Sequence, residues 1–128
     1  MADWLIDSDV LIDGLNGYGD VNARLERSAA SRPLFVSTIS VFELERGARS
    51  SDELLDIRTF LSFFTILPLD WGSASEAASI DADLRRGGIR LDPRDTLIAG
   101  TARARGMEVV TRNRRHFDRV PGLVVAEL

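Results

Sequence analysis

Three acidic residues that lie far apart in the chain, Asp7, Glu43 and Asp95, are the side chains best suited to chemistry. Asp7 follows the short apolar run at residues 4–6, and the other two lie early in helices expected after a second strand and before a fourth. In a parallel sheet, such positions meet beyond the carboxyl ends of the strands, where ligands bind. Clustered carboxylates repel one another unless a cation neutralises them. The spacing therefore predicts a divalent-cation site.

The composition restricts that chemistry to oxygen ligands and arginine. The 128 residues include no Cys and one His, His116, and all 16 basic residues are Arg. A disulfide framework and a zinc–thiolate site are thereby excluded, as are a Schiff-base lysine and a phosphate-loop lysine. Carboxylates, hydroxyls and amides favour a hard cation such as Mg²⁺ or Mn²⁺. A structural or binding role is still compatible with these residues.

The charge is distributed unevenly along the chain. Residues 1–100 carry 17 acids and 10 Arg, a net charge of −7, whereas residues 101–128 carry 6 Arg and 3 acids, a net charge of +3; the total is −4. An anionic partner would therefore meet the C-terminal end of the chain. The alternative is that these Arg side chains only solvate a helix and a loop.

Each acid also has an ordinary structural explanation. Asp7 can cap the helix that follows it, and Asp95 lies three residues after Asp92, the spacing of a capping box. Glu43 has the same spacing from Ser40. At each of the three positions considered alone, helix capping explains the acid as well as a metal site does.

Glu43 is the acid that capping explains least well. It lies between Phe42 and Leu44, which we expect to face the core. Because acids are rarely buried without a partner, an acid beside core residues indicates a specific role.

Short apolar runs alternating with helical stretches predict an α/β domain with a mostly parallel, five-stranded sheet. The expected strands are residues 4–6, 34–36, 65–67, 109–110 and 123–125, and the expected helices are residues 10–15, 21–30, 38–47, 52–64, 70–86 and 93–105. The chain is expected to form one domain over residues 1–128. Phe60, Phe63 and Phe64 are expected to lie in the core or at a dimer contact. The lack of a long apolar run and of a basic N-terminal region predicts a soluble, cytoplasmic protein.

Four segments together resemble a known family. In order, they are LIDSDVLID, STISVFELERG, LDPRDTLIAGTARARG and VVTRNRRHFDRVPGL. In sequence and spacing they resemble the PIN-domain ribonucleases of the VapC toxin type, from residue 4 to residue 125. The resemblance implies a PIN-like α/β/α sandwich.

The resemblance also implies roles for individual residues. Asp7, Glu43 and Asp95 match the metal-binding acids, and Asn113 stands where many family members have a fourth catalytic acid. Ser8 and Thr111 are expected to be helper hydroxyls, and Arg112, Arg114 and Arg115 are expected to contact RNA phosphates. Asp9, Asp92 and His116 lie near these motifs without an assigned role.

The activity implied by the resemblance is hydrolysis of RNA by a Mg²⁺-dependent endoribonuclease, with Mn²⁺ able to substitute and with 5′-phosphate and 3′-hydroxyl products. Such a protein is the toxin of a toxin–antitoxin pair, is held inactive by a cognate antitoxin and forms a homodimer. Neither the target RNA nor the number of metal ions follows from the sequence.

Two alternative functions fit parts of the sequence. A catalytically inactive PIN-like binding module would keep the fold and is favoured by the neutral Asn113. A receiver-type phosphorylation switch would also place acids at strand ends, but it needs a late Lys, which this chain lacks.

Overall fold

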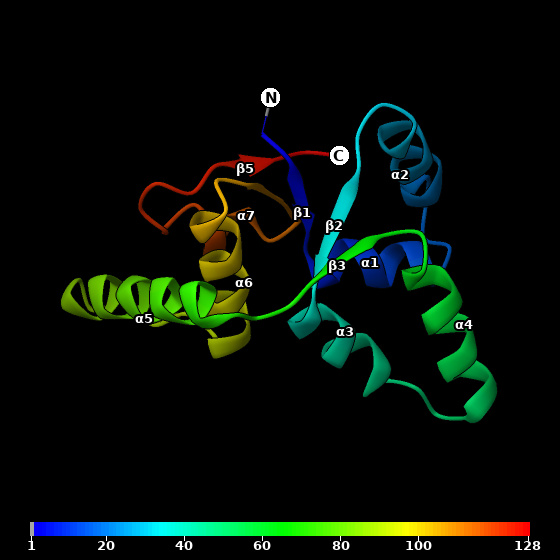
Figure 1. Ribbon diagram of the computed structural model, residues 1–128, viewed down its shortest axis with the longest axis horizontal. Coiled ribbons are helices and arrows are strands. Elements are labelled where there is room, and N and C mark those ends of the chain that lie inside the picture. The colour runs from blue at the N-terminus through cyan, green and yellow to red at the C-terminus, as the bar shows by residue number, and fades with distance from the viewer. Residues whose placement is uncertain (1) are drawn as a thin grey trace.

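A central five-stranded parallel sheet positions the rest of the chain. The structure is a computed structural model that describes residues 2–128 (Figure 1). The strands lie in the order β3-β2-β1-β4-β5, and each neighbouring pair is parallel. Their bounds are β1 Trp4–Ile6, β2 Leu34–Ser37, β3 Thr65–Leu67, β4 Glu108–Val110 and β5 Val125–Ala126.

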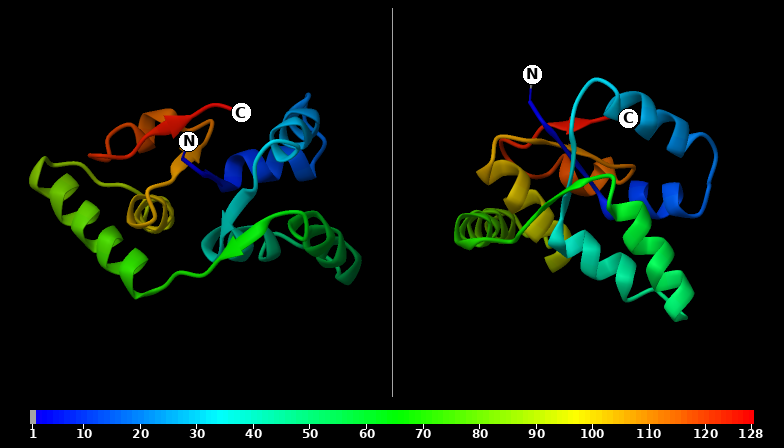
Figure 2. Two further views of the ribbon diagram at one scale, coloured as in Figure 1. Left: turned by 45° about the horizontal axis from the view of Figure 1, so that its top comes forward. Right: turned by 45° about the vertical axis from the view of Figure 1, so that its right-hand side comes forward.

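Helices cover both faces of this sheet. Their bounds are α1 Ser8–Leu15, α2 Val21–Ala29, α3 Thr38–Glu45, α4 Ser51–Leu61, α5 Trp71–Arg86, α6 Pro93–Ala104 and α7 Arg114–Phe117. The two orientations in Figure 2 show α5 and α6 on one side of the sheet and α1, α2 and α4 on the other. Within residues 2–128, no helix combines the length and the apolar character needed to span a membrane.

The central strand β1 contributes to a hydrophobic core on each face. Leu5 and Ile6 are both fully buried, and they belong to separate core clusters because successive side chains of a strand point to opposite faces. Val109 and Val110 of β4 divide between the same two clusters. Burial on both faces explains why these strands are continuous apolar runs rather than alternating ones.

The strand order places a topological switch point between β1 and β4. From β1 the chain adds β2 and then β3 on one side, and it later returns to add β4 and β5 on the other. The register pairs Ile6 with Val110, so the next residue of each strand, Asp7 and Thr111, emerges at the same edge of the sheet. In open α/β sheets, this crevice is where ligands bind.

Helices α5 and α6 approach each other closely at Gly100. A Cβ atom placed on Gly100 would lie 2.6 Å from the Cβ and the backbone nitrogen of Ala77 and 2.7 Å from the carbonyl oxygen of Ser73. These neighbours are backbone or a short side chain and cannot swing aside. Glycine at this position therefore permits the approach of α6, which carries Asp95, to α5.

The expected α/β class, the parallel sheet and most of the elements are confirmed, with four corrections. The last strand forms at Val125–Ala126 instead of residues 123–125, and the fourth helix ends at Leu61. The short helix α7 was not expected, because its four residues carry no apolar period. The fourth correction concerns Phe42, which is 56% exposed and lies near the guanidinium of Arg46 instead of facing the core.

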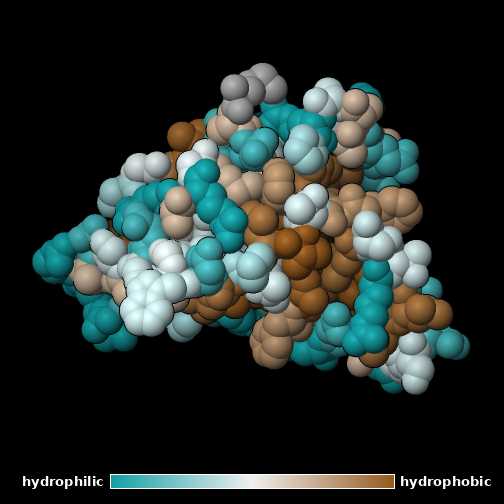
Figure 3. Space-filling model, in the orientation of Figure 1, coloured by the Kyte–Doolittle hydropathy of each residue, from teal (hydrophilic) through white to brown (hydrophobic). Residues whose placement is uncertain are grey.

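The phenylalanines near the end of α4 divide between interior and surface. Phe60 and Phe64 pack against the core cluster on the α1 face, with ring centroids 5.3 Å apart, whereas Phe63 is 80% exposed. Figure 3 shows apolar side chains gathered on this face of the molecule, in the region of β3 and α4. Ile66 of the edge strand β3 is also among the exposed apolar residues.

Candidate active site

Asp7 lies at the switch point and is held by the strand on the other side of it. Its backbone N–H donates to the carbonyl of Val110 at 2.9 Å, and its Oδ2 accepts a hydrogen bond from Thr111 Oγ1 at 2.8 Å. It occupies the N-cap position of α1, as expected, but its side chain makes no capping hydrogen bond there. Only 4% of the residue is exposed.

The environment of Asp7 disfavours its charged form. Burial, and next the negative charge of Asp9, raise the pKa of Asp7 to about 8, although the hydrogen bond from Thr111 acts in the opposite direction. Among residues 2–128, no Arg or His side chain forms an ion pair with Asp7. A buried carboxyl without a cation is costly, and a bound cation would remove that cost.

The Thr111 hydroxyl makes several contacts at the edge of the sheet where β1 and β4 end. Besides donating to Asp7, its Oγ1 accepts the backbone N–H of Asn113 at 2.9 Å. It also lies 3.3 Å from Oδ2 of Asp9, which accepts the backbone N–H of Arg112 at 3.1 Å. The turn after β4 is therefore fixed against two acids of the β1–α1 junction, and Thr111, expected to be a helper hydroxyl, is in hydrogen-bond contact with Asp7.

Glu43 reaches the same region from α3 and is held by hydroxyl groups. Ser8 Oγ lies 2.8 Å from Glu43 Oε1 and 2.7 Å from Ser40 Oγ. The spacing of Ser40 from Glu43 thus reflects a side-chain network, while Ser37 caps α3 by accepting the N–H of Ile39. The side chain of Glu43 is 18% exposed.

Asp95 contacts the imidazole of His116. His116 Nδ1 lies 3.3 Å from Asp95 Oδ2 and 2.7 Å from the side-chain nitrogen of Asn113. Burial raises the pKa of Asp95, and the hydrogen bond with His116 opposes that shift. Asp92 is the residue that caps α6, by accepting the N–H of Arg94 at 2.9 Å. Asp95 is therefore free to face the site.

Arg94 was missed in the sequence analysis, although it lies inside the DPRDT motif. Its guanidinium is held by both carboxylate oxygens of Asp92, each at 3.1 Å, and Nη1 lies 3.6 Å from Glu43 Oε2. This guanidinium supplies a positive charge to Glu43 in the absence of a metal.

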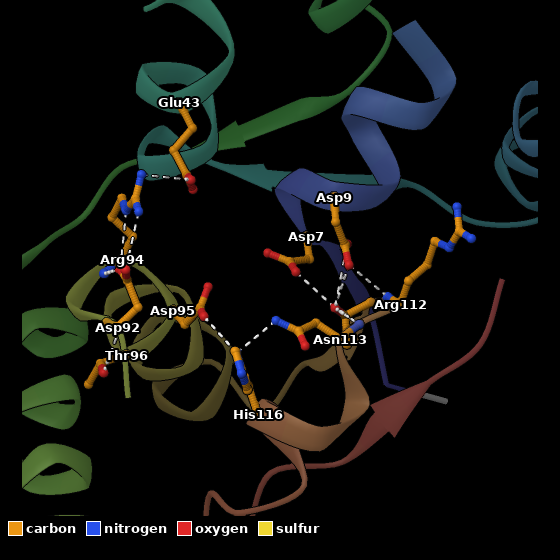
Figure 4. Close-up of polar contacts among 11 residues, drawn as sticks. Asp7, Asp9, Glu43, Asp92, Arg94, Asp95, Thr96, Arg112, Asn113 and His116 are labelled. Atoms are coloured by element: carbon orange, nitrogen blue, oxygen red, sulfur yellow. Dashed lines mark hydrogen bonds and ion pairs between the residues drawn. The ribbon is translucent and has the colours of Figure 1, made fainter. Parts of the chain in front are cut away.

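The three predicted metal ligands face one region without forming a closed ligand group. Figure 4 shows the carboxylates of Asp7, Glu43 and Asp95 directed toward the space between α1, α3 and α6. Across residues 2–128, however, no set of three or more Asp, Glu or His side chains lies close enough to hold one ion jointly. The donor types fit a hard cation, since they are carboxylate and amide oxygens. In this arrangement, Arg94 lies 3.6 Å from Glu43 and His116 lies 3.3 Å from Asp95.

The predicted basic residues after β4 lie at the rim of this region. Arg112 forms an ion pair with Asp13, and Arg114 lies 3.5 Å from Glu127 and 3.8 Å from Asp118. Arg115 is exposed on α7. Among the residues that the structure describes, none of the ion pairs formed by Arg112 and Arg114 involves Asp7, Glu43 or Asp95.

Comparisons with known proteins identify a family and similar folds. Residues 4–123 match the PIN domain family. The tRNA(fMet)-specific endonuclease VapC of Shigella flexneri is 33% identical to this chain over 128 residues, and the match covers 96% of each chain. Ribonuclease VapC10 of Mycobacterium tuberculosis H37Rv is 33% identical over 113 residues, and the match covers 88% of this chain and 84% of the relative. A crystal structure of DNA-bound VapBC from Salmonella typhimurium is similar with a TM-score of 0.89 and 31% identity, covering 99% and 98% of the two chains.

Proposed function

The chain belongs to the PIN-domain family and has VapC-type relatives along nearly its whole length, and from this membership we propose that it hydrolyses RNA as a metal-dependent endoribonuclease. The relatives are named as endonucleases or ribonucleases. The products expected from such hydrolysis carry a 5′-phosphate and a 3′-hydroxyl.

One observation carries this proposal: Asp7 is buried at the switch point of the sheet, hydrogen-bonded to Thr111 and without a cationic partner among residues 2–128. A fold that only needed stability would gain by placing a neutral residue there. A buried carboxyl at Asp7 is explained if the active protein binds a cation there.

Mg²⁺, with Mn²⁺ as a substitute, is the cation that the donor set suits. Asp7, Glu43 and Asp95 would hold it, and Asn113 offers a neutral oxygen instead of a fourth acid. When bound, such an ion supplies an activated water and stabilises charge on the phosphate.

The remaining residues act on these ligands or on the substrate. Thr111 orients Asp7, Ser8 orients Glu43, and His116 orients Asp95, each through the hydrogen bonds that it makes. Arg112, Arg114 and Arg115 are proposed to contact RNA phosphates, so binding should weaken as the salt concentration rises.

The partner of the protein is proposed to be an antitoxin. The similar Salmonella structure is a VapBC complex, and a second one, VapBC2 of Rickettsia felis, has the same fold at 20% identity with a TM-score of 0.87. We propose that this chain is the toxin of such a pair and that it forms a homodimer. The exposed Phe63 near the end of α4 is a candidate contact.

A second candidate function is favoured by the ion pair between Arg94 and Glu43. If Arg94 permanently replaces the cation, the protein is a catalytically inactive PIN-like binding module. This alternative agrees with the neutral Asn113 and with the absence of a closed ligand group in residues 2–128.

Cleavage of RNA by purified, antitoxin-free protein distinguishes the two functions. The nuclease proposal predicts cleavage with Mg²⁺, none with EDTA, and a loss of at least about 100-fold in Asp7→Asn and Asp95→Asn. Asp83→Asn is the matched control, because Asp83 pairs with Arg86 on the exposed side of α5. Full activity in both site variants would overturn the proposal, and inactive wild-type protein would favour the binding module.

A further inference from the structure

A cavity of about 350 Å³ adjoins the carboxylate region through Thr111. Thr111 lines this cavity and also donates to Asp7. The wall includes one aromatic ring, Tyr18, and the guanidinium-bearing residues Arg24, Arg112 and Arg114. It also includes the acids Asp20 and Glu127, which form ion pairs with Arg24 and Arg114. None of the roles described above uses Tyr18 or Arg24.

Tyr18 is exposed, yet its backbone is fixed. The residue is 60% exposed and lies between two glycines in left-handed conformation, Gly17 at φ 68° and Gly19 at φ 55°. Its N–H donates to the carbonyl of Asp13 at 2.9 Å, and its carbonyl accepts the N–H of Val21 at 3.4 Å. The turn therefore presents a large aromatic side chain at the surface instead of burying it.

Arg112 connects this ring to the acids. Its guanidinium carbon lies 5.3 Å from the centroid of the Tyr18 ring and its side chain is ion-paired with Asp13, while its backbone N–H donates to Asp9 at 3.1 Å. Figure 4 shows the Arg112 side chain directed away from Asp7. The same residue thus contacts the acidic cluster through its backbone and the aromatic ring through its side chain.

We propose that Tyr18 and Arg112 form a stacking subsite for an unpaired RNA base next to the cleaved phosphate. Proteins that bind single-stranded RNA stack bases on aromatic rings and guanidinium planes and hold the flanking phosphates with basic side chains. Arg24 and Arg114 are placed for the phosphates, and their exposed ion pairs with acids are weak enough to be exchanged. The inference rests on the proposed function and adds to it a substrate feature, a single-stranded nucleotide beside the reacting bond.

The ring and the three guanidinium groups favour RNA over a protein partner at this cavity. A protein segment would be expected to bring apolar side chains to apolar walls, as at the separate cavity lined by Leu25, Phe60 and Phe63. Here the wall combines apolar residues with three guanidinium groups that are each paired with an acid, and the contact of the Arg112 guanidinium with the Tyr18 ring is the feature that suits a base.

Direct binding of RNA tests the subsite without requiring cleavage. Fluorescein-labelled single-stranded oligo(A) and oligo(U) of equal length are titrated in EDTA with wild-type protein and with the variants Tyr18→Ala, Tyr18→Phe and Trp71→Ala. Trp71 is a matched control, because it is an 88% exposed aromatic residue on α5, which contributes nothing to the cavity. A 2-aminopurine base in the oligonucleotide reports stacking through quenching of its fluorescence.

The expected result is a loss of affinity of roughly 5- to 100-fold in Tyr18→Ala, with Tyr18→Phe and Trp71→Ala close to wild type. The preference for oligo(A), whose bases stack more strongly, and the quenching of 2-aminopurine should both disappear in Tyr18→Ala. Because the ring is exposed, the melting temperature should not change.

Other outcomes separate failure of the subsite from failure of the proposed function. Wild-type binding that Tyr18→Ala retains in full, with the same quenching, overturns the subsite and leaves the nuclease proposal intact. If Tyr18→Ala binds RNA as the wild type does but no longer forms a complex with the antitoxin, Tyr18 contacts a protein, and the stacking subsite is overturned. A wild-type protein that neither binds nor cleaves RNA contradicts the nuclease proposal, and the subsite falls with it.

Discussion

Thr111 Oγ1 donates a 2.8 Å hydrogen bond to Oδ2 of Asp7, and this contact joins the carboxyl ends of β1 and β4 across a sequence separation of 104 residues. Parallel pairing of Ile6 with Val110 brings the two residues together. The hydrogen bond is thus a direct product of the strand order, and it holds the acid that the proposed chemistry requires.

Removing this hydroxyl should impair activity more than folding. Thr111→Val keeps the shape of the side chain but leaves the Asp7 carboxyl without its donor, so RNA cleavage should fall by about 10- to 100-fold, the usual effect of losing a group that orients a metal ligand. Thr111→Ser retains the hydroxyl and should remain near wild type. Equal cleavage rates for Thr111→Val and wild type would show that the hydrogen bond does not orient Asp7.

The raised pKa of Asp7 predicts an unusual dependence of stability on pH. Its value of about 8 in the folded protein exceeds the ordinary 3.8, so the folded state binds the proton more tightly than the unfolded state. In metal-free protein, the contribution of Asp7 is most favourable below about pH 4 and is lost as the pH rises toward 8. Over pH 5 to 8 the loss should be on the order of 2–4 kcal/mol.

Urea unfolding in EDTA at pH 5 and pH 8 measures this effect. The difference in unfolding free energy between wild type and Asp7→Asn isolates the carboxyl, and Asp7→Asn should be the more stable protein at pH 8. Added Mg²⁺ should stabilise the wild type but not the variant. A stability difference that stays constant between the two pH values would mean that Asp7 titrates normally.

Arg94 is predicted to compete with the cation for Glu43. Because the ion pair is partly exposed and 3.6 Å long, removing it in Arg94→Gln should tighten Mn²⁺ binding by only about two- to five-fold in calorimetric titration. Arg85→Gln, which removes a surface pair with Asp81, is the control. Weaker Mn²⁺ binding by Arg94→Gln would assign Arg94 a supporting role instead.

The close approach of α5 and α6 predicts that alanine substitution changes stability differently at two glycines. Gly100→Ala places a Cβ atom 2.6 Å from Ala77 and should destabilise the protein by about 1–3 kcal/mol. Gly72→Ala on α5 meets nothing nearer than 3.8 Å and should be neutral or stabilising. Urea midpoints of the two variants provide the comparison, and similar midpoints would contradict the tight approach of the helices.

The sequence predicted the elements best where a local signal marks their boundaries. Asp92 followed by Pro93 predicts the start of α6, and the structure has this cap. The fully buried run Leu5–Ile6 predicts β1 because both faces of the sheet are covered. By contrast, α7 has no apolar period and β5 has two residues, so tertiary pairing rather than local pattern sets their limits.

The candidate site was predicted less completely, since side-chain partners depend on the tertiary fold. The acids were predicted from their places after strands and early in helices, and Figure 4 shows the three carboxylates directed toward one region. The ion pair between Arg94 and Glu43 and the stacking of Arg112 on Tyr18 join segments remote in the chain, so no spacing rule reveals them. Phe42 was misplaced because α3 is apolar on several sides, and periodicity there does not identify the buried face.

The most direct test of the central claim is the anomalous density of a crystal of the antitoxin-free protein grown with Mn²⁺. The account predicts one strong peak between α1, α3 and α6, with oxygens of Asp7, Glu43 and Asp95 each about 2.0–2.6 Å away and with the Arg94 guanidinium moved off Glu43. A crystal with no peak there, or with a peak bound by only one of these carboxylates, would contradict the claim that the three acids share a cation.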